Sequence, residues 1–127
     1  MEDTYRVGKY QGGTFMQDKL VILWTSGDPI TAEKMVFMYA INAMKSAWWH
    51  EITLVIWGAS ATLAAKDEVI QDHIVALIEE GADVVACKAC ADSLDVSDDL
   101  EALGVTVKYM GEPLTGYLKL DYKILSV

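Results

Sequence analysis

Basic residues are scarce in this chain. Ten Lys and Arg residues face nineteen Asp and Glu residues, for a formal net charge of −9. This balance excludes electrostatic binding to nucleic acid or to an anionic membrane surface. Long apolar runs are missing too, because the longest candidate, 35–49, is interrupted by Asn42, Lys45 and Ser46 and falls short of the roughly 20 residues that span a bilayer. The first four residues lack the basic start and apolar core of a signal peptide, so we expect a cytoplasmic protein.

Proline and histidine are nearly absent, with two residues of each. Pro29 and Pro113 both stand where a helix is predicted to begin, which leaves no proline for the cis-proline of a thioredoxin fold. His50 and His73 are far in sequence from the two cysteines, whereas structural zinc sites use closely spaced ligand pairs. The chain also lacks a G-x-G-x-x-G fingerprint and a P-loop. We therefore expect no metal and no nucleotide or other cofactor.

Apolar residues are abundant, at 53%, and they gather in five runs. The first run does not alternate, so both of its faces should be buried, as in a parallel sheet. Helices are predicted between the runs, over residues 28–48, 67–80, 98–103 and 111–120, while 59–66 is expected to be a loop of small residues that can include a helical turn. The runs cover residues 20–24, 52–57, 82–87, 105–110 and 122–127. This alternation predicts an α/β three-layer sandwich, flavodoxin- or Rossmann-like, with a mostly parallel five-stranded sheet flanked by helices.

The first long helix is apolar nearly all round. A helix of that kind is covered on every side, and in a domain of this size the sheet can cover only one of its faces. A second copy of the chain is the natural cover for the other face, so we expect a homo-oligomer. Residues 1–18 show no clear period and are predicted to form an N-terminal arm, with the α/β domain over 19–127.

Two cysteines, Cys87 and Cys90, stand at the end of the third apolar run. A thiol there lies near the carboxyl edge of the sheet, where open α/β folds bind ligands. A following helix and the neighbouring Lys88 both favour the reactive thiolate. The competing interpretation is that both cysteines are small buried hydrophobic residues, as most free cysteines are.

Two further loops end at the same edge of the predicted sheet. Gly27 and Asp28 follow the first strand, and Gly58 and Ser60 follow the second. These four residues are candidates for a pocket beside the cysteines. For Asp28 a helix-capping role is favoured over phosphate binding, because its charge has the wrong sign and Pro29 has no amide to donate.

Residues 82–96 have the sequence Ala-Asp-Val-Val-Ala-Cys-Lys-Ala-Cys-Ala-Asp-Ser-Leu-Asp-Val, and over this stretch the chain most specifically resembles the DsrE-like family, the sulfur-relay group that includes TusD-type and YchN-type proteins. The resemblance extends over 19–127, with support from 57–61 and 109–115. It implies a parallel sheet flanked by helices, assembled as trimers or hexamers. Cys87 takes the place of the family's sulfur-carrying cysteine, and Cys90 matches a second cysteine found in some members.

Three functions follow as hypotheses. In the first, a persulfide on Cys87 carries sulfane sulfur from a donor protein to a partner thiol, with Lys88 stabilising the thiolate and Cys90 as a second reactive thiol, which would make the protein a sulfurtransferase or persulfide carrier. In the second, the chain is a non-catalytic oligomeric module with structural cysteines. In the third and weaker hypothesis, the C-x-x-C pair acts as a dithiol oxidoreductase.

Overall fold

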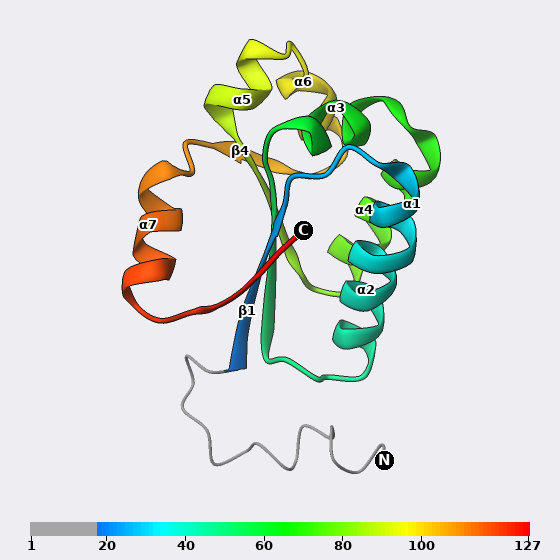
Figure 1. Cartoon of the computed structure of the whole chain (residues 1–127). Coiled ribbons are helices and arrows are strands. Elements are labelled where there is room, and N and C mark those ends of the chain that lie inside the picture. Colours follow the sequence, from blue (N-terminus) through cyan, green and yellow to red (C-terminus); the bar gives the residue numbers. More distant parts are fainter. Residues whose placement is uncertain (1–17) are drawn as a thin grey trace.

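The computed structural model describes residues 18–127, and its core is a five-stranded sheet in which every strand pair is parallel (Figure 1). The strand order is β4-β3-β2-β1-β5. The strands are β1 (Lys19–Trp24), β2 (Glu51–Ile56), β3 (Asp83–Cys87), β4 (Thr106–Lys108) and β5 (Lys123–Ser126). All five predicted strands are therefore present. The arm predicted over residues 1–18 lies, apart from Asp18, outside the described residues.

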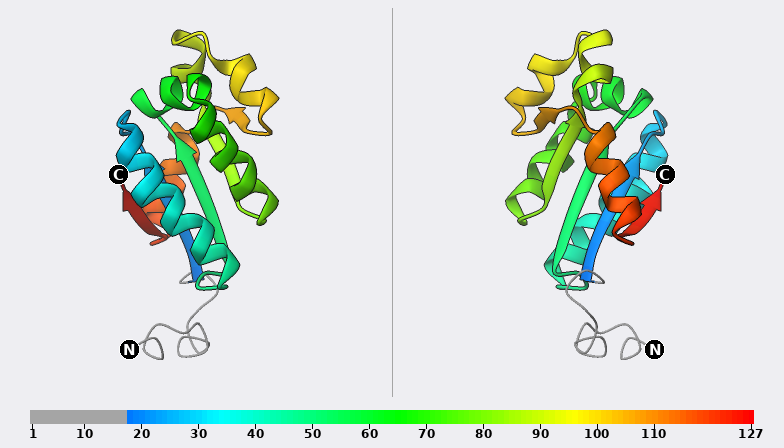
Figure 2. Two further views of the ribbon diagram at one scale, coloured as in Figure 1. Left: turned by 90° about the vertical axis from the view of Figure 1, so that its right-hand side faces the viewer. Right: turned by 90° about the vertical axis from the view of Figure 1, so that its left-hand side faces the viewer.

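Helices cover the two faces of this sheet unequally (Figures 1 and 2). The first face carries a continuous helical stretch after β1, together with α3 and α4, whereas α7 lies on the second face. Two short helices, α5 and α6, stand at the carboxyl end of the strands. The helical elements are α1 (Pro29–Thr31), the π-helical segment η4 (Ala32–Phe37), α2 (Met38–Lys45), α3 (Ala59–Lys66), α4 (Glu68–Glu79), α5 (Lys88–Ser93), α6 (Ser97–Ala102) and α7 (Gly111–Lys119). The predicted three-layer α/β sandwich is confirmed.

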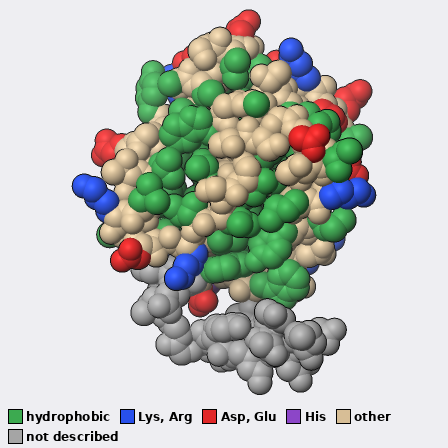
Figure 3. Space-filling model, in the orientation of Figure 1, with side chains coloured by type: hydrophobic (Ala, Val, Ile, Leu, Met, Phe, Trp, Pro, Cys, Tyr) green, Lys and Arg blue, Asp and Glu red, His purple; other side chains and the backbone are tan. Residues whose placement is uncertain are grey.

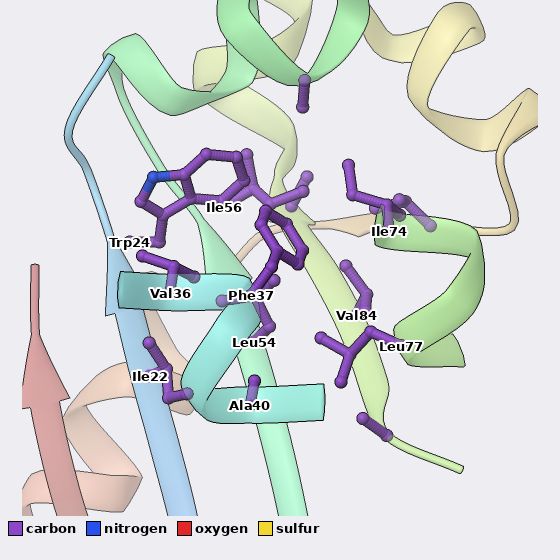
Figure 4. Packing of buried hydrophobic residues seen from close by; sticks show 14 of the residues in the cluster. Ile22, Trp24, Val36, Phe37, Ala40, Leu54, Ile56, Ile74, Leu77 and Val84 are labelled. Carbon is purple, nitrogen blue, oxygen red and sulfur yellow. The ribbon is translucent and has the colours of Figure 1, made fainter. Parts of the chain in front are cut away.

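The main hydrophobic core lies between the first face and its helices (Figure 4). Side chains that alternate along β1 and β2 point into it, and Ile22, Trp24 and Leu54 are fully or almost fully buried. The Trp24 and Phe37 rings meet edge to face with their centroids 5.3 Å apart, a geometry that aromatic pairs favour. The strands are apolar at successive positions because each of them is buried on both faces of the sheet.

The second face has a thinner core. Its buried members are Val21, Val55, Val85, Cys87 and Met110. α7 packs on this cluster through Tyr117, which is half-buried. Because α7 is the one helix over this face among residues 18–127, part of the face beside β3 and β4 is left without a helix above it.

The predicted end of the first long helix was wrong. The first long helix ends at Lys45 rather than near Trp48, because the chain turns at Ala47, whose φ is 54°. The Trp48 amide donates to the Ala43 carbonyl (2.9 Å) and the Ala47 amide to the Met44 carbonyl (3.2 Å), which is a Schellman C-cap.

Residues 59–66, predicted to be a loop that can include a helical turn, are helical throughout and form α3. Small residues suggested a loop, but alanine has the highest helix propensity of all residues. Ala61 and Ala64 are buried in the main core, so packing adds to that propensity.

Hydrophobic side chains gather on the face of the molecule that holds the edge strand β5, between α7 and the η4–α2 stretch (Figure 3). Large apolar side chains that are at least a third exposed include Ile30, Met35, Met38, Trp48, Leu118 and Leu120. The first long helix is thus covered on one side only within residues 18–127. A second copy over the exposed side remains a prediction.

Within residues 18–127, no helix has the length and apolar character needed to cross a membrane.

Candidate functional site

Cys87 is the last residue of β3 and the N-cap of α5. Its side chain faces the second side of the sheet, where it packs with Val85, Val55 and Met110, and it is 6% exposed. The Cys87 side chain makes no capping hydrogen bond to α5. The predicted position at the carboxyl edge of the sheet is confirmed, while the thiol itself is more enclosed than a surface nucleophile.

Cys90 lies one turn into α5 and is half-buried. The backbone N–H of Gly58 donates to Cys90 Sγ at 3.1 Å. This contact joins the loop after β2 to the helix after β3. Both cysteines are free thiols. The carboxyl edge therefore holds two thiols of different character, with Cys87 packed among apolar side chains and Cys90 held by an amide.

Lys88 is engaged with its own helix. Its Nζ lies 2.8 Å from the Asp92 carboxylate and 5.8 Å from the centroid of the Tyr109 ring. The hydrogen bond between the two side chains raises the pKa of Lys88 and, together with a hydrogen bond from Ser97, lowers the pKa of Asp92. The ammonium is thus directed at Asp92, and a role for Lys88 in stabilising a Cys87 thiolate remains a prediction.

Gly58 and Ser60 lie where α3 begins, Gly58 as its N-cap and Ser60 in its first turn. Ser60 is fully buried, donates its hydroxyl to the Trp24 carbonyl (2.6 Å) and accepts from the Trp57 amide (3.1 Å). It therefore connects the carboxyl ends of β1 and β2. Gly58 has φ 74° and ψ −135°, a conformation that glycine adopts without strain, and this backbone aims its N–H at Cys90.

Gly27 and Asp28 lie in the loop after β1. A Cβ added at Gly27 would stand 3.1 Å from the Ala59 Cβ, so the loop after β1 contacts the first turn of α3. Asp28 caps α1 by accepting from the amide and the hydroxyl of Thr31, both at 2.8 Å, and these hydrogen bonds hold the pKa of Asp28 below its ordinary value. The capping role predicted for Asp28 is confirmed. Of the four candidate pocket residues, Gly58 directly contacts a cysteine.

Lys108 was missed by the sequence analysis. It is the register partner of Cys87 in the β3–β4 pair, so both side chains project from the same face of the sheet. Lys108 also lines a groove of about 390 Å³ on that face. The available signal was the alternation of Thr106 and Lys108 with Val105 and Val107, which predicts that one face of this strand is exposed to solvent. Alternation does not reveal the neighbouring strand, so Cys87 could not be named as the partner.

Metal ligands are not grouped in the part of the chain that the structure describes. Residues 18–127 contain no cluster of three or more His, Cys, Asp and Glu side chains able to hold a metal ion. His73 stacks on Phe37 instead, with ring centroids 5.7 Å apart. The nucleophilic side chains that the structure places at this edge of the sheet are the free thiols of Cys87 and Cys90.

A sequence model described as the DsrE/DsrF-like family matches residues 18–127. Among solved structures, the fold is similar to a conserved protein of unknown function from Bacteroides thetaiotaomicron, with 43% identity and a TM-score of 0.85 over 87% of this chain and 95% of that one. It is also similar to the ychN protein from E. coli, with 18% identity and a TM-score of 0.67 over 87% of this chain and 99% of that one. A protein of unknown function from Methanobacterium thermoautotrophicum has 15% identity and a TM-score of 0.66 over 86% and 98%. None of the curated proteins matches the chain.

Proposed function

The chain belongs to the DsrE/DsrF-like family, which is generally linked to sulfur relay, and on that premise we propose that it carries sulfane sulfur as a persulfide on Cys87 and passes it to a partner thiol. The observation that carries the proposal is the position of Cys87 at the carboxyl end of a central parallel strand. Ligands of open α/β sheets bind at this edge.

The proposed reaction is an exchange between thiols. Sulfur of the Cys87 thiolate attacks the outer sulfur of a donor persulfide, R–S–SH. A new S–S bond forms on Cys87 as the donor's S–S bond breaks, and R–S⁻ leaves and takes up the proton that Cys87 lost. A partner thiolate then attacks the outer sulfur of the Cys87 persulfide and regenerates the Cys87 thiolate. Neither step needs an external oxidant or reductant.

Cys90 gives the site a second route. Its thiolate can attack the inner sulfur of the Cys87 persulfide, which forms a Cys87–Cys90 disulfide and releases hydrosulfide. This route requires the two side chains to reach disulfide geometry, and a further thiol must then reduce the disulfide. The Gly58 amide that donates to Cys90 Sγ supports the idea of a stabilised sulfur at this position.

Mass spectrometry after exposure to a persulfide donor tests the carrier role. We expect one additional sulfur atom on Cys87 in the wild type and in Cys90→Ser, and none there in Cys87→Ser. Incubation of the loaded protein with a thiol acceptor should return Cys87 to its free form. An unmodified Cys87 in folded protein, under conditions that load a known carrier, contradicts the proposal.

The enclosure of Cys87 favours a second candidate function, a non-catalytic assembly module in which the cysteines are packing residues. Cys87 is 6% exposed, and large apolar side chains such as Met38 and Leu120 are available for contacts. Alkylation separates the candidates. If neither thiol reacts until the protein is unfolded, the module is correct, whereas reaction of Cys87 in the native state supports the carrier.

The C-x-x-C spacing keeps the dithiol oxidoreductase as a weaker third candidate. It predicts that Cys90→Ser abolishes activity, whereas simple sulfur carriage on Cys87 survives that change. Under the carrier proposal the partners are a sulfur donor and a sulfur acceptor protein in the cytoplasm. We further propose a homo-oligomer, a trimer or hexamer, whose mass light scattering would measure.

A further inference from the structure

Part of the second face, beside α7, has no described helix over it (Figure 2). A groove lies there, and its lining extends to Ile78, Ala82 and Gly104 at the amino ends of β3 and β4. Val85 forms part of its floor, and Tyr117 and Tyr122 line it from the α7 side. Asp83 and Glu51 lie in the groove toward the amino ends of the strands, and Lys108 lies toward their carboxyl ends. Its volume of about 390 Å³ falls in the range of small-ligand sites, about 300–1,000 Å³.

The strand register arranges the charges of this groove along one line. Asp83, Val85 and Cys87 alternate along β3 and therefore project from the same face. Lys108 is the partner of Cys87 across the β3–β4 pair. Cys87 is four positions after Asp83, which corresponds to about 13 Å along a strand. The groove thus has a positive end at Lys108, the register partner of Cys87, and a negative end two pleats away, while Cys87 itself lies just outside the lining.

The negative end is reinforced from the neighbouring strand. Asp83 pairs with Thr53 of β2, and Glu51 lies one pleat before Thr53 on the same face. Tyr117 lines the same groove as both carboxylates, and burial, together with the charges of Tyr122, Asp83 and Glu51, raises its pKa. At neutral pH the Tyr117 hydroxyl therefore stays protonated and can act as a donor beside the carboxylates.

The two tyrosines supply an aromatic wall between the charged ends. Their ring centroids are 5.0 Å apart and their planes are tilted by 43°. An aromatic ring packs well against a peptide backbone or an ammonium group. A ligand that fits this lining has an ammonium group at one end, a carboxylate at the other and a peptide-like body between them.

We infer that the groove binds a small zwitterionic thiol peptide, and that the persulfide of such a peptide delivers sulfur to Cys87. This inference rests on the carrier function proposed above. Its ammonium group would lie at Asp83 and Glu51, its carboxylate at Lys108, and its sulfur toward Cys87. A tripeptide spans about 10 Å, which suits the roughly 13 Å between the two ends once side chains reach inward.

The chemistry is the exchange already described, with R as the peptide. The bond between the two sulfurs of the peptide persulfide breaks as the bond to Cys87 Sγ forms, and the free thiol peptide leaves with the Cys87 proton. Lys108 also attracts the anionic form of the persulfide to the enclosed thiol. The groove thereby distinguishes a peptide donor from inorganic polysulfide, which has no ammonium group for Asp83.

The test measures the rate at which Cys87 gains sulfur from two donors, glutathione persulfide and inorganic polysulfide. For Asp83→Asn we expect the half-saturating concentration of glutathione persulfide to rise about tenfold, because the variant loses one charged contact with the ammonium group. Polysulfide should react as with the wild type, because Asp83 is more than a Debye length of about 8–10 Å from Cys87. For Lys108→Met we expect both donors to react more slowly. Asp95→Asn and Lys66→Met, exposed residues outside the groove, serve as matched controls.

Two results separate this inference from the carrier function. If Asp83→Asn treats glutathione persulfide as the wild type does while Cys87 is still loaded, the groove inference is wrong and the carrier function stands. If no donor loads Cys87, the carrier function fails, and binding of S-methylglutathione then decides the groove. The groove inference is supported if this ligand shifts the NMR signals of the Tyr117 and Tyr122 rings in the wild type but not in Asp83→Asn. It is overturned if the ring signals of the wild type do not move at millimolar ligand.

Discussion

Replacement of Gly58 by alanine tests whether the backbone conformation of residue 58 is needed for stability and for the hydrogen bond to Cys90 Sγ. Gly58 has φ 74° and ψ −135°, and a Cβ built there meets nothing within 4 Å. Any loss of stability must therefore come from the backbone rather than from a clash. A non-glycine residue in such a region costs about 1–3 kcal/mol. Alanine also lowers the conformational entropy of the unfolded chain, which offsets about 0.4–1 kcal/mol of this loss of stability. We expect a net loss of about 1–2 kcal/mol in the free energy of unfolding.

The same substitution should reach Cys90. The strain is relieved most simply by rotation about Gly58, and that rotation turns its N–H away from Cys90 Sγ, now 3.1 Å distant. Native-state alkylation of Cys90 should accordingly change in rate in Gly58→Ala, while the rate at Cys87, which that amide does not contact, stays close to that of the wild type.

Gly116→Ala is the matched control. A Cβ at Gly116 also meets nothing within 4 Å, but Gly116 lies inside α7 and has no positive φ. Alanine there should stabilise the helix by about 0.5–1 kcal/mol. Urea unfolding of both variants at one protein concentration, with unchanged m-values, should separate them by about 2 kcal/mol. Equal stability of the two variants would refute the reasoning.

The remaining predictions concern capping and charge. Ala47→Gly should raise the free energy of unfolding by up to about 1 kcal/mol, because Ala47 holds the left-handed C-cap position that glycine prefers; a lower unfolding midpoint contradicts this. Asp67→Ala should lower the free energy of unfolding by about 1 kcal/mol, because it removes the side chain that caps two amides of α4, and urea unfolding would measure this loss. Asp67→Asn should keep most of the stability, because asparagine also caps helices. The lowered pKa of Asp92 means that its contribution to stability is present above its unfolded-state pKa and is lost as the pH falls through its folded-state pKa. Lys88→Met should therefore move the NMR-detected Asp92 titration to higher pH, and an unmoved titration rejects the Lys88–Asp92 contact.

The sequence predicted the five strands and the helices over 67–80, 98–103 and 111–120 well, but it predicted neither the helix α3 nor the end of the first long helix. Five apolar runs became five parallel strands, because a strand covered on both faces must be apolar at successive positions. The helix at 59–66 was missed, since its alanines pack against a core that is assembled from distant segments. Likewise, the end of the first helix at Lys45 depends on a left-handed alanine, a conformation that composition does not predict.

The amino-acid sequence by itself determined the layered architecture and the position of a C-x-x-C pair at the end of the third strand, because periodicity and turn residues are local properties of a chain. Only the tertiary structure decided what surrounds those thiols. It enclosed Cys87 against the second face, set Lys108 beside it and directed the Gly58 amide to Cys90. These contacts join separate βα units, and strand register, which the spacing of residues within one segment does not encode, sets the neighbours across a sheet.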